Sequence, residues 1–239
     1  MALTHSPRII TDGLVLCLDA ANTKSYPRSG TTWSDISNNG NNGTMTNMDG
    51  TNFNSGNGGY LTFDGTNEYT SVTISNFFTS FTQQITMEAW IYVPTAATWT
   101  NGNRGNIVAR GNFDGAHGLW RTTTDNQVSF YGRQTSTPIE FSESVGSIAR
   151  DAWYQLVGIW NGGPILYING SLAQSKSITF TTGGTENDVP FEIGRNTAAG
   201  GAAGNWFNGN VAGVKIYNRA LNDGEVTQNF NALRGRFGI

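Results

Sequence analysis

Apolar and polar residues alternate along several segments of the chain, and this alternation predicts β-strands. The clearest example is residues 84–93, where every second residue from Ile85 to Val93 is apolar. A period of two turns successive side chains to opposite faces of a sheet. Similar apolar segments predict further strands over residues 13–18, 60–64, 69–74, 106–110, 118–122, 127–133, 153–160, 165–168, 171–176, 191–195 and 210–217.

Turn signals separate these segments. Asn-Gly occurs seven times and Asp-Gly five times, and both dipeptides tolerate the positive φ angles of tight hairpin turns. Short strands between frequent hairpin turns are typical of an antiparallel all-β protein. The Asn- and Gly-rich residues 35–57 are expected to form ordered turns, because Met45, Met48 and Phe53 give this segment apolar side chains to bury.

One segment near the C-terminus has the pattern of a helix. Asn222 fits the N-cap position, and Glu225 follows three residues later, as in a capping box. Three apolar residues then share one helix face: Val226, Phe230 and Leu233. Gly235 is predicted to end this short helix.

Length and composition bound the architecture. The 239 residues include 31 Gly, and only 13% are charged. About a dozen strands suit two stacked sheets, and no change of composition divides the chain. We therefore predict an all-β fold: a two-sheet antiparallel β-sandwich (jelly roll) with one short C-terminal helix, as a single domain over residues 1–239.

Charge and cysteine content exclude several classes of protein. The net charge of −3 provides no basic surface for a nucleic acid. Cys17 is the only cysteine, so no internal disulfide can form, and its apolar neighbours predict a core position. The N-terminal segment has neither the apolar stretch of a signal peptide nor that of a membrane span.

Carboxylate catalysis has little support in this sequence. Glycoside hydrolysis needs two carboxylates about 5–9.5 Å apart. Glu88 is the one carboxylate inside a strongly predicted strand, and it has no acidic neighbour at a suitable spacing, so we expect it on the sheet surface. His5 and His117 do not fit a nucleophile–base pair, and the sequence predicts a protein that is not an enzyme.

Two segments have side chains suited to ligands. Asp64, Asn67 and Glu68 place three oxygen-bearing side chains in one turn, which is a composition suited to Ca²⁺, although a hairpin turn with Asx hydrogen bonds is the simpler explanation. Residues 111–125 mix the polar and aromatic groups that bind sugars, and a packed loop would have the same composition. The candidate saccharide-binding residues are Asn112, Asp114, His117, Trp120 and Arg121.

The last residues are a candidate partner contact. A terminus frays unless something holds it, and this one ends in two apolar residues beside two arginines. The residues concerned are Arg234, Arg236, Phe237 and Ile239. Packing of this tail against its own sheet is the alternative.

Several segments together resemble a known family. YLTFDGTNEYTSV, ITMEAWIYV, AWYQLVGIWNGGPILYINGSL, FEIGR and FNGNVAGVKIYNRALNDGEV are similar, in order, to strands of concanavalin A-like lectin/glucanase jelly rolls of the laminin G type. The opening and closing segments resemble versions of this domain in bacteriophage structural proteins. The resemblance implies a binding or structural role, with Ca²⁺ in some members. The Glu-x-Asp-x-x-Glu strand motif of the glucanase branch is missing here.

The leading hypothesis is a non-enzymatic phage virion surface protein, either a head decoration or a tail or fibre component. It would use a lectin-like jelly roll for capsid attachment, host glycan binding, or both. Expected partners are other virion proteins, cell-surface glycans and further copies of the chain, with no nucleic acid and no membrane insertion. The alternatives are a cellular carbohydrate-binding lectin module and a divergent polysaccharide hydrolase.

Overall fold

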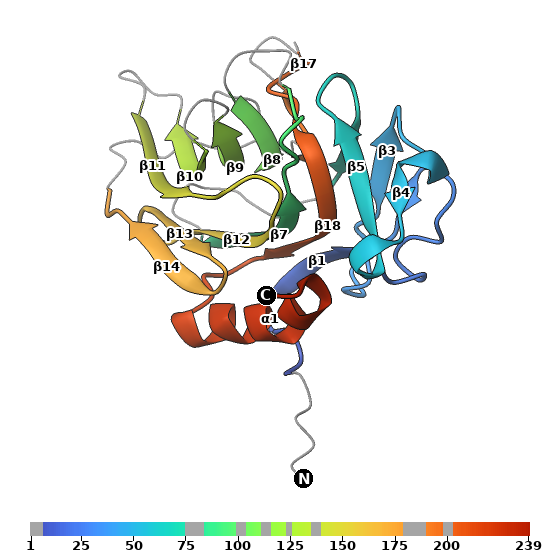
Figure 1. The fold of residues 1–239 in the computed structure, drawn as a ribbon. Helices are drawn as coiled ribbons and strands as arrows, with labels where there is room; N and C mark the ends of the chain where they lie inside the picture. The colour runs from blue at the N-terminus through green and yellow to red at the C-terminus, as the bar shows by residue number, and fades with distance from the viewer. Residues whose placement is uncertain are drawn as a thin grey trace.

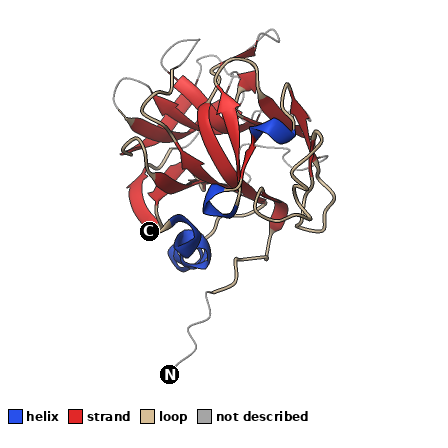
Figure 2. Ribbon diagram, turned by 45° about the vertical axis from the view of Figure 1, so that its right-hand side comes forward, coloured by secondary structure: helices blue, strands red, loops and turns tan. Residues whose placement is uncertain are grey.

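The strands form two antiparallel sheets that face each other, with a helix outside them (Figure 1). The computed structural model describes residues 7–74, 84–98, 104–110, 116–122, 126–134, 140–178, 190–197 and 203–239. Figure 2 shows the layers of strands, with the C-terminal helix on the outside of them. The predicted fold class, an all-β sandwich with a C-terminal helix, is confirmed.

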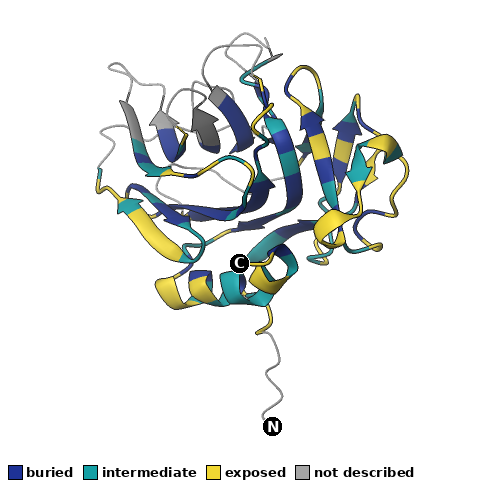
Figure 3. Ribbon diagram, viewed as in Figure 1, coloured by how far each residue is buried: buried dark blue, intermediate teal, exposed yellow. Residues whose placement is uncertain are grey.

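The first sheet has eight strands, and the C-terminal helix packs against its central strands. In spatial order they are β14 (Ser171–Ser175), β13 (Pro164–Ile168), β12 (Trp153–Trp160), β7 (Ile85–Tyr92), β18 (Asn208–Tyr217), β5 (Tyr60–Asp64) and β4 (Phe53–Asn54), with β1 (Leu14–Asp19) also paired to β18. β7, β12 and β18 are eight to ten residues long and almost wholly buried (Figure 3).

The second sheet also has eight strands. In spatial order they are β11 (Glu140–Ser147), β10 (Gln127–Gln134), β9 (Ala116–Thr122), β8 (Arg104–Arg110), β15 (Phe191–Ile193), β6 (Tyr69–Val72), β3 (Gly43–Thr46) and β2 (Thr32–Trp33). A separate hairpin joins β16 (Asn196–Thr197) to β17 (Ala203–Gly204). Two 3₁₀ turns, η1 (Gly50–Asn52) and η2 (Gly56–Gly58), flank β4.

Large side chains from one sheet rest on glycines of the other. A Cβ atom on Gly158 of β12 would lie 2.1 Å from Phe130 of β10, and one on Gly132 of β10 would lie 2.2 Å from Trp160 of β12. The two sheets therefore interlock where a glycine faces an aromatic ring. Cys17 is 4% exposed, which confirms its predicted burial.

Two of the Asn-Gly dipeptides form the tight turns that the sequence predicts, whereas Asn208-Gly209 lies within β18 and Gly43 begins β3. Asn169 and Gly170, between β13 and β14, have φ angles of 50° and 75°. Asn57 and Gly58 have φ angles of 49° and 80°. Positive φ at both central positions is the geometry that these residues favour.

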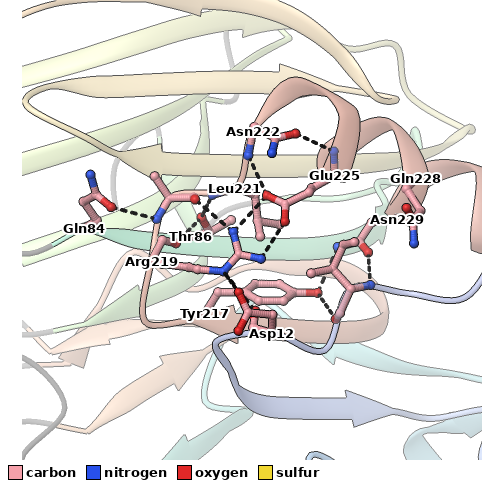
Figure 4. Close-up of polar contacts among 12 residues, drawn as sticks. Asp12, Gln84, Thr86, Tyr217, Arg219, Leu221, Asn222, Glu225, Gln228 and Asn229 are labelled. Atoms are coloured by element: carbon pink, nitrogen blue, oxygen red, sulfur yellow. Dashed lines mark hydrogen bonds and ion pairs between the residues drawn. The ribbon is translucent and has the colours of Figure 1, made fainter.

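Helix α1 (Asp223–Phe237) begins as predicted and ends later than predicted. The Asn222 side chain accepts a hydrogen bond from the Glu225 backbone, and the Glu225 side chain accepts one from the Asn222 backbone (Figure 4). The prediction that Gly235 ends the helix is wrong, because the helix continues to Phe237 and is capped by Gly238 in the left-handed conformation. No described helix combines the length and apolar character needed to span a membrane.

The helix covers the outer face of the first sheet, where Trp90 and Trp153 contact it. The Trp90 ring stacks on Phe237, with centroids 4.2 Å apart, and on Phe230, with centroids 5.9 Å apart. Trp153 also contacts Phe237. Because of this cover, Glu88 is 1% exposed, so the expectation of a sheet-surface residue is wrong.

Candidate binding site

The predicted saccharide-binding residues lie in or beside a part of the chain that the structure does not describe. Asn112 and Asp114 lie outside the described residues. His117, Trp120 and Arg121 are on β9, in register with β8 and β10, and their side chains are likewise outside the described set. Their role stays a prediction.

The predicted calcium turn is described, and hydrogen bonds occupy its carboxylates. Asp64 Oδ1 accepts hydrogen bonds from the backbone amides of Thr66 and Asn67, at 2.7 and 3.1 Å. The two oxygens of Glu68 accept from the Asp64 backbone and from the Asn52 side chain, at 2.8 Å each. Partial burial raises the pKa of Glu68. Among the described residues, no three His, Cys, Asp or Glu side chains group as metal ligands.

The predicted partner contact divides into buried and exposed residues. Phe237 is 6% exposed, and Arg236 forms an ion pair with Asp19 (2.7 Å) and donates to the backbone oxygens of residues 57 and 59. The expectation that these two residues face a partner is therefore corrected, because the helix packs them against the chain's own sheet. Arg234 and Ile239 are exposed, and their contact with a partner stays a prediction.

A row of paired residues crosses the outer face of the second sheet. Ser71, Glu192, Ala109, Gly118 and Tyr131 lie opposite one another on β6, β15, β8, β9 and β10. Residues directly opposite each other project to the same face, and the alternate residues of these strands fill the core. The row therefore faces away from the core, and all of its residues except Ser71 are buried.

Arg195 is held rigidly beside this row. Its Nε and Nη2 atoms donate to Glu192 Oε1 at 2.8 and 2.6 Å. The guanidinium carbon lies 3.4 Å from the ring centroid of Tyr69 and 5.5 Å from that of Trp206. The side chain is 17% exposed, and Nη1 has no hydrogen-bond partner among the residues described.

Two further polar side chains, those of Asn196 and Asn106, lie next to the row. Asn196 donates to the Tyr131 hydroxyl at 2.9 Å, and the Tyr131 ring lies over Gly118, where a Cβ atom would be 2.8 Å away. The Asn196 carbonyl oxygen is buried with no hydrogen-bond partner in the described chain. The amide group of Asn106, on β8, is buried in the same way at both atoms. Unsatisfied buried amides are costly, so each of them favours an additional polar partner.

The sequence did not predict a site around Arg195. The residues grouped there, called the arginine cluster below, are Tyr69, Glu192, Arg195, Asn196 and Trp206. Glu192 and Arg195 were recognised only as parts of a strand. The available signal was weak: a Glu and an Arg three residues apart, with Gly194 between them at a φ of 91°. The sheet pairing is what brings Tyr69 to this cluster.

Comparison with known proteins places the fold. The family model of the concanavalin A-like lectin/glucanases superfamily, laminin G type, matches residues 56–227. A search of curated proteins gave no match.

Similar solved structures come from toxin binding domains. The receptor binding domain of botulinum neurotoxin C/D mosaic serotype is 12% identical, with a TM-score of 0.70 over 92% of this chain and 51% of that one. The botulinum neurotoxin serotype D ligand binding domain in complex with N-acetylneuraminic acid is 13% identical, with a TM-score of 0.70 over 92% and 51%. The binding domain of Paraclostridial Mosquitocidal Protein 1 is 19% identical, with a TM-score of 0.66 over 93% and 52%.

This chain thus spans about half the length of these solved chains, and the likeness at such low identity is one of fold. The family model, by contrast, covers more than half of the chain in sequence. The two sheets and their pairing agree with that match. The chain belongs to the concanavalin A-like lectin/glucanases superfamily.

Proposed function

We propose that this chain is a non-enzymatic glycan-binding domain, with the arginine cluster as its site. The observation that carries the proposal is the Arg195 guanidinium, which Glu192 and Tyr69 hold in one orientation while Nη1 keeps no partner in the described chain. A fixed guanidinium can donate to neighbouring sugar hydroxyls without losing side-chain entropy on binding. Trp206 provides an aromatic group beside it.

Two findings support binding rather than hydrolysis. Glu192 is engaged by Arg195, and its opposite residues in the sheet are Ser71 and Ala109, so no second carboxylate lies directly across from it. The pair of carboxylates that glycoside hydrolysis requires is therefore not formed around Glu192. The similar solved structures also include a receptor binding domain and a ligand binding domain in complex with N-acetylneuraminic acid.

The test is a glycan array followed by calorimetry with the best ligand. Arg195→Met should weaken binding at least about tenfold, because loss of a charged hydrogen bond costs about 1.5–3 kcal/mol. Arg234→Met is the matched control, since Arg234 also lies over a ring, that of Phe230, on the far helix. Undiminished binding by Arg195→Met would show that the site lies elsewhere on the domain. Failure of the wild-type protein to bind any glycan would refute the lectin function.

We also propose that the domain acts on a phage virion surface, in contact with other virion proteins and host glycans. The support is the sequence resemblance of the opening and closing segments to phage structural proteins. Labelled-antibody imaging of native particles tests it: label on particles supports the virion role. Glycan binding without particle association would favour a cellular lectin.

A further inference from the structure

A lysine, a carboxylate and an asparagine lie together beneath helix α1. Lys215 of β18, Glu88 of β7 and Asn229 of α1 are 6%, 1% and 0% exposed. Lys215 Nζ lies 2.7 Å from Glu88 Oε1, and Asn229 Nδ2 lies 2.8 Å from Glu88 Oε2. One carboxylate therefore binds both a primary amine and a carboxamide, one through each of its oxygens.

The carboxamide is held in one orientation by two more contacts. Asn229 Oδ1 accepts a hydrogen bond from the backbone amide of Ile10 at 2.8 Å. Asn229 Nδ2 donates to the Tyr217 hydroxyl at 2.9 Å, and that hydroxyl donates to the Ile10 carbonyl at 3.1 Å. Figure 4 shows the Asn229 side chain directed at Tyr217. The carbonyl oxygen thus faces a fixed donor and the nitrogen faces the carboxylate.

Lys215 and Glu88 form a buried ion pair, and the hydrogen bond between them is a direct path for a proton. Burial opposes the charge on Lys215, although the Glu88 carboxylate outweighs it and raises the pKa of the amine. Transfer of a proton from Nζ to Oε1 along their hydrogen bond converts the ion pair into a neutral pair and removes the desolvation cost of two buried charges. The neutral amine so formed is a nucleophile.

We propose that Lys215 and Asn229 form an intramolecular isopeptide bond, with Glu88 as the catalytic acid and base. Glu88 takes a proton from the Lys215 ammonium, and the free Nζ electron pair attacks Cγ of Asn229. The Nζ–Cγ bond forms, and the carbonyl electron pair moves to Oδ1, where the Ile10 amide stabilises the developing oxyanion.

The second half of the reaction releases ammonia. Glu88 gives its proton to Nδ2, the Cγ–Nδ2 bond breaks as the carbonyl re-forms, and the second Nζ proton passes through Glu88 to the departing ammonia. The products are a secondary amide and an ammonium ion, and no oxidant or other co-reactant is needed. Fixed neighbouring reactants reach effective concentrations of about 10⁵–10⁸ M, which allows an amide to react with an amine in a folded protein.

The bond would fasten α1 to the sheet. It joins β18 to the helix across 14 residues of sequence, and the same helix carries Phe230 and Phe237 onto Trp90. A covalent link at this point prevents the helix from detaching, which suits a binding domain that is exposed to proteases or mechanical load.

Mass spectrometry of the purified full chain tests the proposal. The intact mass should be lower than the sequence mass by one ammonia. Trypsin should fail to cut after Lys215, and the digest should contain a branched peptide that joins residues 196–219 to residues 220–234. Absence of this peptide from the folded wild-type protein overturns the proposal.

Variants separate this bond from other ammonia losses, because the Asn-Gly dipeptides also lose ammonia when they form succinimides. Lys215→Arg and Glu88→Gln should each restore the full mass, whereas Lys176→Arg, at an exposed lysine, should keep the deficit. A deficit that persists in folded Lys215→Arg also overturns the proposal. If both buried-site variants fail to fold, the branched peptide of the wild type decides the question.

Discussion

Replacing Phe237 by alanine tests whether the C-terminal residues belong to the fold. Phe237 is 6% exposed, and its ring stacks on Trp90 with an interplanar angle of 15° and contacts Trp153 at 4.8 Å between centroids. Truncation of a buried Phe costs about 3–5 kcal/mol, and stacked ring pairs contribute about 0.5–1.5 kcal/mol each within that cost. We expect a loss of about 4 kcal/mol in the free energy of unfolding.

The measurement is thermal unfolding followed by circular dichroism. At about 2–4 °C per kcal/mol for a chain of this length, the melting temperature of Phe237→Ala should fall by about 8–16 °C. The control is Ile239→Ala, two residues further on, where the side chain is 40% exposed and the change should stay within about 0.5 kcal/mol. A melting temperature for Phe237→Ala equal to that of the wild type would refute the packing argument.

Three further predictions address the sheet, the helix and the turn. Gly118→Ala should destabilise the protein by about 1–3 kcal/mol in urea unfolding, because the new Cβ atom would lie 2.8 Å from the Tyr131 ring; an unchanged midpoint would contradict this. The Arg219 hydrogen bonds hold the pKa of Glu225 below its ordinary value of 4.5, so the contribution of this carboxylate to stability is present above pH 4.5 and is lost as the pH falls through the lower folded pKa. Glu225→Gln should therefore flatten that part of the melting temperature–pH profile, and an unaltered profile would count against the ion pair. Chelation of Ca²⁺ should leave the melting temperature unchanged, because backbone and side-chain amides already donate to Asp64 and Glu68; a drop on chelation that Asp64→Asn abolishes would show that the turn binds the ion.

Local interactions are what the sequence determined by itself. The period-two pattern of β7 and the Asn-Gly turn at Asn169 depend on neighbouring residues, and the structure confirms both. The helix N-terminus was predictable for the same reason, since Asn222 and Glu225 cap it across three residues. Strands of two residues, such as β2 and β4, are too short to show a period, and only pairing with β3 and β5 defines them.

Contacts between distant residues decided the remainder. Gly235 costs a helix about 1 kcal/mol, whereas burial of the Phe237 ring stabilises it by about 1.5–3 kcal/mol, so tertiary packing extends the helix past its local stop signal. The position of Glu88 in its strand predicts an exposed side chain. Helix α1 buries this side chain and brings Asn229, which is 141 residues away in sequence, into contact with it. The cluster around Arg195 likewise exists only because sheet pairing brings Tyr69 beside it, and no short-range pattern records such an arrangement.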